Sequence, residues 1–274
     1  MYEDEVQFPP HVSGVKDAID IHCHAHEGQP DALALAKHAS KSEMRGILYK
    51  TTVGRDRPAE AVRGVQAALE AWSEAKGVRP IQCWAGYNVA HTGKPPSAAA
   101  TRAQLEDGVV AVWMPVAMHA NTLSKVGGRK VFRLVAEYDR AVFFAHATHP
   151  EIWAMAEEVD RLGIKQAVVD HPFSPFVDLS VEQMQELARV GVYLNFTYDE
   201  LSPLLGVDPM QMYRAIRAVG VEQVTLSSDA GEPLFPNTVE AMRQIRAYMR
   251  AFGLSDEEVH QVSSINPGKV VGLS

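Results

Sequence analysis

The chain has 274 residues, of which 46% are hydrophobic and 22% charged, with a formal net charge of -8. This length and composition allow a full core. We expect a single domain over residues 1–274, with an N-terminal extension at 1–17 and a C-terminal helix and tail at 254–274. Because the chain is acidic and no Lys/Arg block stands out, we expect a small-molecule substrate, no nucleic-acid partner and no membrane partner.

The cysteines and apolar segments bear on the cellular compartment. Cys23 and Cys83 are too few for a disulfide framework, and no basic segment followed by an apolar one opens the sequence. No apolar run approaches the roughly 18 residues of a membrane span. These features predict a cytoplasmic protein, and they leave open whether it forms a homo-oligomer.

Short apolar runs alternate with longer amphipathic stretches, which predicts repeated strand and helix units and a parallel sheet. The expected strands are, in chain order, 18–24, 45–50, 80–87, 110–116, 141–146, 166–171, 192–198 and 224–229. Eight such units favour a single closed (β/α)8 barrel of the TIM type, an α/β fold, over an open sheet. Boundaries are least defined in 88–108 and 117–140, where Gly, Pro, Asn and Ser interrupt short helical patterns.

Several predicted helices have recognisable ends. Pro150 suits the first turn of a helix that Gly163 ends, and Asp208-Pro209 opens another that Gly220 ends. Three residue pairs have the spacing of a capping box: Ser180 with Gln183, Asn237 with Glu240, and Ser255 with Glu258.

The first predicted strand closes with His22-Cys23-His24. Because side chains alternate along a strand, His22 and His24 share one face and Cys23 lies on the other. Paired neutral imidazoles suit zinc, iron or manganese. A bare His-x-His pair is also typical of ordinary hydrogen-bonded histidines, so the interpretation depends on finding further ligands.

Ligand-type residues also close later strands. His146 ends the fifth, His171 the sixth and Asp229 the eighth. Active sites of this fold gather where strands end, so we expect these residues to converge with the first two histidines. The alternative is a set of buried structural histidines that bond to backbone carbonyls.

The chain resembles the amidohydrolase superfamily in three segments, which are Asp20-Ile-His-Cys-His24, Asp170-His-Pro172 and Asn266 to Leu273. The resemblance covers nearly the whole chain, and residues 44–50 and 112–115 look closer to a branch of mostly uncharacterised members. It implies a metal-dependent hydrolase with one or two divalent ions, zinc first and manganese or iron as alternatives. The implied metal ligands are His22, His24, His146, His171 and Asp229.

The fourth strand departs from the superfamily pattern. Binuclear members usually place a bridging carboxylated Lys or a Glu there, whereas this strand ends with Trp113, Met114 and Pro115. Lys50 closes the second strand and is a further candidate ligand if it is carboxylated. An unmodified Lys50 with a structural or substrate-binding role is the safer interpretation, because a metal ion repels an ammonium group. A mononuclear site is equally open.

The expected chemistry follows from the metal, which lowers the pKa of bound water. Asp229 is expected to accept the proton of that water and pass it to the leaving group, with simple ligation as its alternative role. His146 would polarise the substrate or stabilise an oxyanion in a mononuclear site. The predicted reaction is hydrolysis of an amide, ester, lactone or related bond. A metal-dependent decarboxylase of the same superfamily and a barrel that binds without turnover are the alternatives.

Polar residues that follow predicted strands are weaker candidates for substrate contact. Asn88 and Tyr198 are favoured because they lie closest to strand ends. The others are His26, Glu27, His91, His119, His149, Asp199 and Glu232.

Overall fold

The computed structural model describes residues 14–25, 31–50, 56–89, 97–114, 128–144, 146–231 and 235–273. Eight strands form one parallel sheet in sequence order. They are β1 (Ile19–Cys23), β2 (Gly46–Tyr49), β3 (Gln82–Asn88), β4 (Ala111–Trp113), β5 (Ala141–Phe144), β6 (Ala167–Asp170), β7 (Tyr193–Thr197) and β8 (Val224–Ser227). Seven of the predicted ranges contain the whole of one strand, and the third, 80–87, contains all of β3 except its last residue, Asn88.

The first and last strands meet just beyond β8. Cys23 forms a parallel bridge with Ala230, the Asp229 N–H donates to the His22 carbonyl over 2.9 Å, and the His24 N–H donates to the Ala230 carbonyl over 2.7 Å. The sheet is therefore a nearly closed (β/α)8 barrel of the TIM type, which confirms the predicted fold class.

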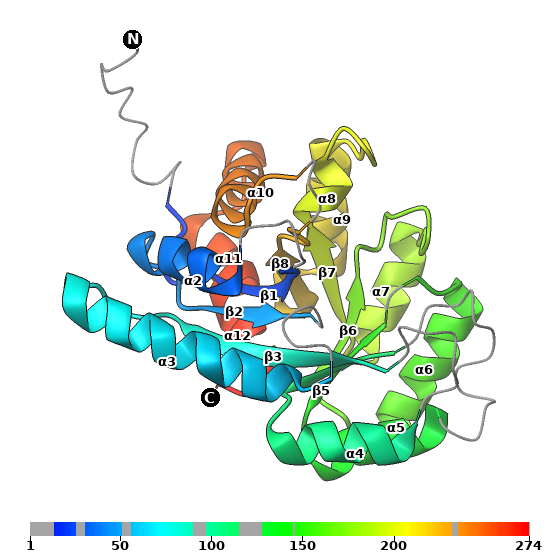
Figure 1. The fold of residues 1–274 in the computed structure, drawn as a ribbon. Coiled ribbons are helices and arrows are strands. Elements are labelled where there is room, and N and C mark those ends of the chain that lie inside the picture. The colour runs from blue at the N-terminus through cyan, green and yellow to red at the C-terminus, as the bar shows by residue number, and fades with distance from the viewer. Residues whose placement is uncertain are drawn as a thin grey trace.

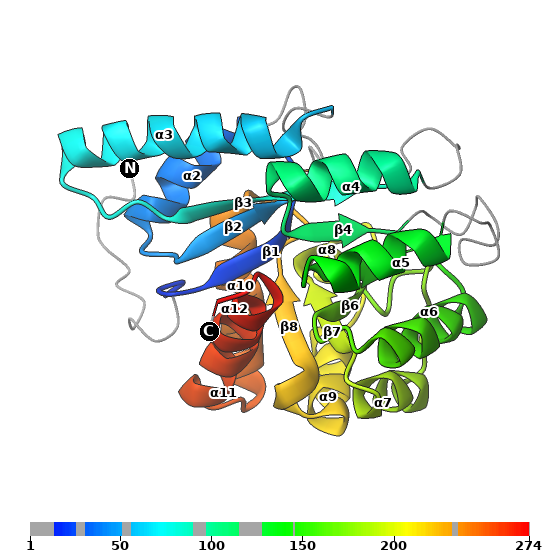
Figure 2. The same ribbon diagram turned by 90° about the horizontal axis from the view of Figure 1, so that it is seen from below.

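Helices surround the strands (Figures 1 and 2). They are α2 (Ala32–Lys41), α3 (Pro58–Lys76), α4 (Ala98–Asp107), α5 (Gly128–Glu137), α6 (His149–Leu162), α7 (Val181–Arg189), α8 (Tyr198–Leu201), α9 (Pro209–Val219), α10 (Thr238–Phe252), α11 (Asp256–His260) and α12 (Asn266–Val270). A π-helical turn, Gln261–Ile265, joins the last two, and α12 packs against β1 and β8. No helix within the described ranges is long and apolar enough to cross a membrane.

Most of the predicted helix ends are confirmed. Pro150 lies in the first turn of α6, and Gly163 and Gly220 follow α6 and α9 as C-caps. The capping boxes at residues 180–183 and 255–258 are present. The third predicted capping box, Asn237 with Glu240, forms only one of its two hydrogen bonds. Asn237 accepts the backbone N–H of Glu240, but the Glu240 side chain does not return the bond because it pairs with Arg243 instead.

Strand alternation sorts the apolar side chains into an outer cluster beneath the helices and an inner cluster within the barrel. Two tryptophans of the inner cluster lie across glycines on the neighbouring strand. A Cβ on Gly46 would lie 2.1 Å from the Trp84 ring, and a Cβ on Gly86 would lie 2.3 Å from the Trp113 ring. The described part of the interior is thus filled like a protein core, and in this fold active sites lie where the strands end.

Candidate metal centre

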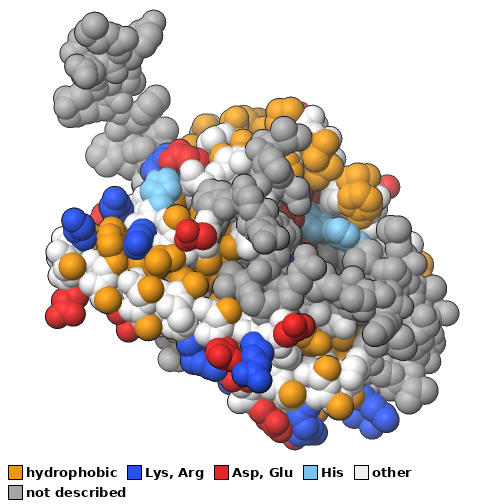
Figure 3. All heavy atoms as spheres, viewed as in Figure 1, with side chains coloured by type: hydrophobic (Ala, Val, Ile, Leu, Met, Phe, Trp, Pro, Cys, Tyr) orange, Lys and Arg blue, Asp and Glu red, His pale blue; other side chains and the backbone are white. Residues whose placement is uncertain are grey.

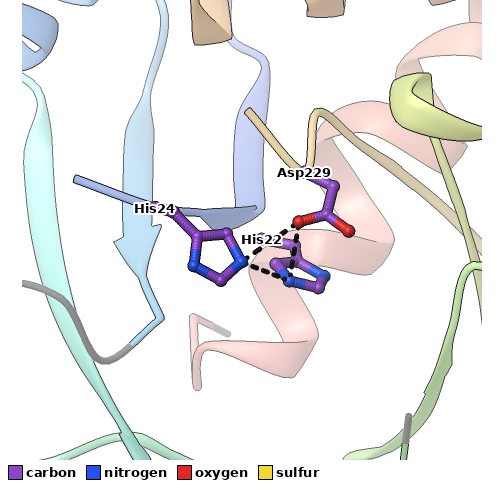
Figure 4. Close-up of side chains that lie close together, drawn as sticks. All are labelled: His22, His24 and Asp229. Atoms are coloured by element: carbon purple, nitrogen blue, oxygen red, sulfur yellow. Dashed lines mark hydrogen bonds and ion pairs between the residues drawn. The ribbon is translucent and has the colours of Figure 1, made fainter. Parts of the chain in front are cut away.

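Three side chains come together where β1 and β8 end (Figure 4). Nε2 of His22 and Nε2 of His24 are 3.2 Å apart, and Oδ1 of Asp229 lies 3.1 Å from each. Within the described part of the chain, this is the one group of at least three His, Cys, Asp or Glu whose ligand atoms all lie within 4.8 Å of one another. We refer to His22, His24 and Asp229 as the ligand trio. Two imidazole nitrogens and a carboxylate oxygen are ligands typical of zinc, manganese and iron.

The local backbone explains this convergence. The register between β1 and β2 shifts between Asp20 and Cys23, at the point where the histidine pair begins. The Cys23 sulfur lies on the opposite face, 2.9 Å from the Thr238 hydroxyl on α10, as strand alternation requires.

The three residues that close the fifth, sixth and eighth strands share an unusual backbone conformation. His146, His171 and Asp229 have φ angles of 53°, 35° and 48°. Residues with side chains rarely adopt this left-handed region, and it is found more often at functional sites. In each case the chain turns sharply within two residues of the end of its strand.

His171 and His146 lie beside the trio rather than within it. His171 is buried and its Nε2 lies 3.9 Å from Oδ2 of Asp229, the carboxylate oxygen that does not contact the first two histidines. The ring of His146 lies 4.9 Å from the ring of His171 and stacks on Phe176 at 5.1 Å. His171 therefore lies near the second oxygen of Asp229, and His146 lies beside His171.

Lys50 reaches the same place from β2. Its Nζ lies 3.0 Å from Nε2 of His22 and 5.7 Å from the centre of the Trp113 ring, and the residue is buried. An ammonium group only donates hydrogen bonds, so here it occupies the lone pair of the His22 nitrogen. A cation bound to that nitrogen would require Lys50 to move, lose its proton or be modified.

Burial and charge set the protonation states of the cluster. Burial lowers the pKa of His24 to about 4 and that of His171 to about 3, and it also lowers the pKa of His146. Burial alone would raise the pKa of Asp229, but contacts with His22 and His24 hold it well below its usual value. At neutral pH these three imidazoles are uncharged and Asp229 is ionised, which are the states that metal binding requires.

Four buried residues without an assigned role in the sequence surround His22. Asp170 lies beneath its ring, where it is bonded by Trp113 and Asn195, and Asp20 accepts its backbone N–H over 3.1 Å. Strand alternation gave one usable signal. It places Asp170 on the inner face of β6, where an ionised carboxylate is stable only with partners.

A buried pair of acidic residues follows β7. Glu200 accepts the backbone N–H of Phe173 over 2.7 Å and that of Thr197 over 2.9 Å, whereas Asp199 accepts the Thr197 hydroxyl. Burial raises the pKa of Glu200 to about 8 and raises that of Asp199, and the charge of Asp229 adds to both shifts. Asp199 and Glu200 therefore stay protonated at pH values above the ordinary pKa of a carboxyl group.

The weaker candidates for substrate contact lie on different elements of the structure. Asn88 ends β3 and is half-buried, and the Tyr198 hydroxyl donates to Gln244 on α10 over 2.9 Å. His149 lies 4.0 Å from Glu186. His26, Glu27, His91, His119 and Glu232 lie outside the described residues, as do residues 1–13 of the expected extension.

Comparison with known proteins finds solved structures with a similar fold. A model described as a family of unknown function, DUF6282, matches residues 127–195, and no curated protein matches the chain. Among solved structures, a dihydroorotase from Campylobacter jejuni is 11% identical with a TM-score of 0.64, covering 98% of this chain and 87% of its own. A beta-aspartyl dipeptidase from Fervidobacterium islandicum AW-1 is 17% identical with a TM-score of 0.64, covering 93% and 75%. An N-acetyl-D-glucosamine-6-phosphate deacetylase from Mycobacterium smegmatis is 15% identical with a TM-score of 0.60, covering 94% and 78%. The likeness is one of fold.

Proposed function

We propose that this protein is a metal-dependent hydrolase of the amidohydrolase type that cleaves an amide, ester, lactone or related bond in a small molecule. The observation that carries the proposal is the ligand trio, whose three donor atoms lie within 4.8 Å of one another at the mouth of a barrel. The resemblance of the strand-end residues to the amidohydrolase superfamily supports it. So does a fold shared with proteins named as a deacetylase and a dipeptidase.

The residues present fit a divalent ion, with zinc as the first choice. Two imidazole nitrogens and one carboxylate oxygen supply the donors, the pKa of His24 keeps that ring neutral, and Asp170 lies against the far nitrogen of His22. His22, His24 and Asp229 would hold one ion. His146 and His171 are the proposed ligands of a second ion, because His171 lies 3.9 Å from the other oxygen of Asp229 and His146 lies beside His171.

The chemistry is divided among residues of the mouth. A bound metal ion supplies a water of lowered pKa and polarises the scissile group. Asp229 would hold the proton of that water and pass it to the leaving group, because Oδ1 lies 3.1 Å from both histidines and Oδ2 is its other oxygen. In a mononuclear site, His146 would instead act on the substrate as a neutral imidazole that donates to the developing oxyanion, since it is half-buried and its pKa is lowered by burial.

Two further residues have proposed roles with substrate or metal. Lys50 either becomes a ligand after carboxylation or, as an ammonium, orients an anionic group of the substrate, since its Nζ lies 3.0 Å from the trio. Asn88 at the end of β3 is a proposed substrate contact, and Tyr198 is a weaker one because its hydroxyl is bonded to α10. The space-filling view shows histidines beside a hollow on this face, with apolar side chains close by (Figure 3).

The test is the metal content per chain, by elemental analysis of protein purified without added metal or chelator. His22→Ala/His24→Ala is compared with His260→Ala, which changes an exposed histidine on α11. We expect the double variant alone to lose bound metal. About one ion per wild-type chain would indicate a mononuclear site, and about two would indicate that the second pair of histidines also binds. A wild-type chain that binds no metal after reconstitution would contradict the proposal.

A further inference from the structure

A buried polar network crosses the barrel beneath the ligand trio. The indole N–H of Trp113 on β4 donates to Oδ2 of Asp170 on β6 over 2.8 Å, and the side-chain amide of Asn195 on β7 donates to Oδ1 over 2.8 Å. Nδ1 of His22 on β1 lies 3.2 Å from the same Oδ1. All four residues are at most 1% exposed. Strands on opposite sides of the barrel are thereby linked through one carboxylate.

The network fixes the carboxylate of Asp170 in position. A buried charge is tolerated only when partners replace its lost water, and each oxygen of Asp170 has a side-chain N–H donor. Asn195 is itself held, since it accepts the Thr225 hydroxyl over 2.9 Å and donates to Ser227 over 2.8 Å. Neither donor can turn away without leaving a polar group unpaired in the core.

This carboxylate, together with the cation beside Nε2, favours one position for the hydrogen of His22. Among the described residues, Oδ1 of Asp170 is the polar atom that lies beside Nδ1, and the two form a charge contact rather than a linear hydrogen bond. Each ring nitrogen has a carboxylate oxygen beside it, because Oδ1 of Asp229 lies 3.1 Å from Nε2, so the hydrogen is favoured on Nδ1 where a cation takes the lone pair of Nε2. The ammonium of Lys50, 3.0 Å from Nε2, requires the lone pair on that same nitrogen.

The position of Trp113 depends on its neighbours. A Cβ on Gly86 of β3 would lie 2.3 Å from the indole, so the glycine provides the space for it, and the ring of Phe143 on β5 stacks on it at 4.1 Å. The indole is therefore held flat across the barrel with its N–H directed at β6. The end of β4 therefore contributes a hydrogen-bond donor to Asp170, the residue whose carboxylate contacts Nδ1 of His22.

We infer that Trp113, Asn195 and Asp170 form a positioning relay that fixes the tautomer of His22, so that its Nε2 lone pair faces the metal. None of the three touches the reacting atoms. The inference rests on the proposed function, because the relay serves the ligand trio. It adds that metal affinity is controlled from the far side of the barrel, through an indole N–H on β4.

The experiment compares two Trp→Phe variants of the inner cluster. Trp113→Phe keeps an aromatic ring and removes the N–H that Asp170 accepts, whereas Trp84→Phe makes the same change on β3 away from Asp170. Zn2+ affinity is measured by competition with a chromophoric chelator, and urea unfolding of the metal-free chains reports folding. We expect affinity about 10- to 100-fold weaker in Trp113→Phe than in Trp84→Phe at similar stability.

A second measurement reads the tautomer without metal. In metal-free protein labelled with 15N-histidine, two-bond 1H–15N spectra identify the protonated nitrogen of each ring, and His22→Gln assigns the His22 signals. We expect the Nδ1–H form in wild type and in Trp84→Phe, and a mixture of forms in Trp113→Phe. Equal affinities and unchanged tautomers in both variants would overturn the relay. If wild type shows the Nδ1–H form and Trp113→Phe shows the expected mixture, but wild type binds no Zn2+, the relay would stand and the proposed hydrolase would be contradicted.

Discussion

Asp20 on β1 and Ser228 beyond β8 are joined by two hydrogen bonds. Oδ1 of Asp20 accepts the Ser228 backbone N–H over 3.1 Å, and Oδ2 accepts the Ser228 hydroxyl. Asp20 precedes His22 by two residues, and Ser228 directly precedes Asp229. The pair therefore joins the two segments that supply the ligand trio, at the point where the barrel closes.

Ser228→Ala is expected to destabilise the protein by about 1 to 3 kcal/mol, because a buried carboxylate loses its hydroxyl donor. Weaker metal binding should accompany this loss, since the register of β1 against β8 sets the trio. Urea unfolding and Zn2+ competition measure the two effects. Ser73→Ala is the control, because the buried Ser73 hydroxyl on α3 has no hydrogen-bond partner among the residues that the structure describes. Equal behaviour of the two variants would show that the pair is not a structural link.

Much of the fold could be predicted from the sequence because it depends on local patterns. The alternation of apolar runs gives eight strands, and their ends place His22, His24 and Asp229 on one rim. The short helix α8 directly after Thr197 was not foreseen, because its capping box overlaps the end of an apolar strand.

The hydrogen bonds that hold Asp170 beside His22 could not be predicted from the sequence. Trp113 and Asp170 are 57 residues apart in sequence, and their hydrogen bond exists only because the barrel brings β4 and β6 together. The left-handed turns at His146 and His171 are likewise not readable from the sequence, since only a small fraction of residues with side chains adopt that conformation. Strand parity gives the direction of a side chain but not its partner across the barrel.

Glu200 predicts a loss of stability as the pH rises. Its pKa is raised by burial from 4.5 to about 8, so the folded state keeps a proton that the unfolded chain releases above 4.5. The stability it contributes is full below pH 4.5 and is lost as the pH rises through 8. Glu200→Gln should therefore flatten the decline between pH 5 and 8 in urea unfolding. Glu74→Gln, an exposed change on α3, should leave the wild-type slope, and a similar slope in all three would contradict the assignment.

His171 predicts the opposite sign. Burial lowers its pKa from 6.5 to about 3, so the unfolded chain takes up a proton that the folded state excludes. The stability contributed by neutral His171 is present above pH 6.5 and is lost as the pH falls toward 3. In chelator-treated protein, His171→Gln should reduce the fall in unfolding free energy between pH 6.5 and 4.5. His260→Gln serves as the exposed control, and no difference between the variants would argue against a buried neutral imidazole.

Alanine substitutions at Gly86 and Gly46 distinguish an effect on core packing from an effect on metal binding. A Cβ on Gly86 would lie 2.3 Å from Trp113, and one on Gly46 would lie 2.1 Å from Trp84, so alanine at either position must displace a buried ring. Each substitution should cost about 1 to 3 kcal/mol in unfolding free energy.

Of these two, Gly86→Ala alone should also weaken Zn2+ binding, because it moves the indole that bonds to Asp170. Gly64→Ala on α3, where a Cβ meets nothing within 4 Å, should stabilise the chain by about 0.5 to 1 kcal/mol. Equal loss of Zn2+ affinity in Gly46→Ala and Gly86→Ala would mean that general loosening of the core, and not the position of Trp113, controls metal binding.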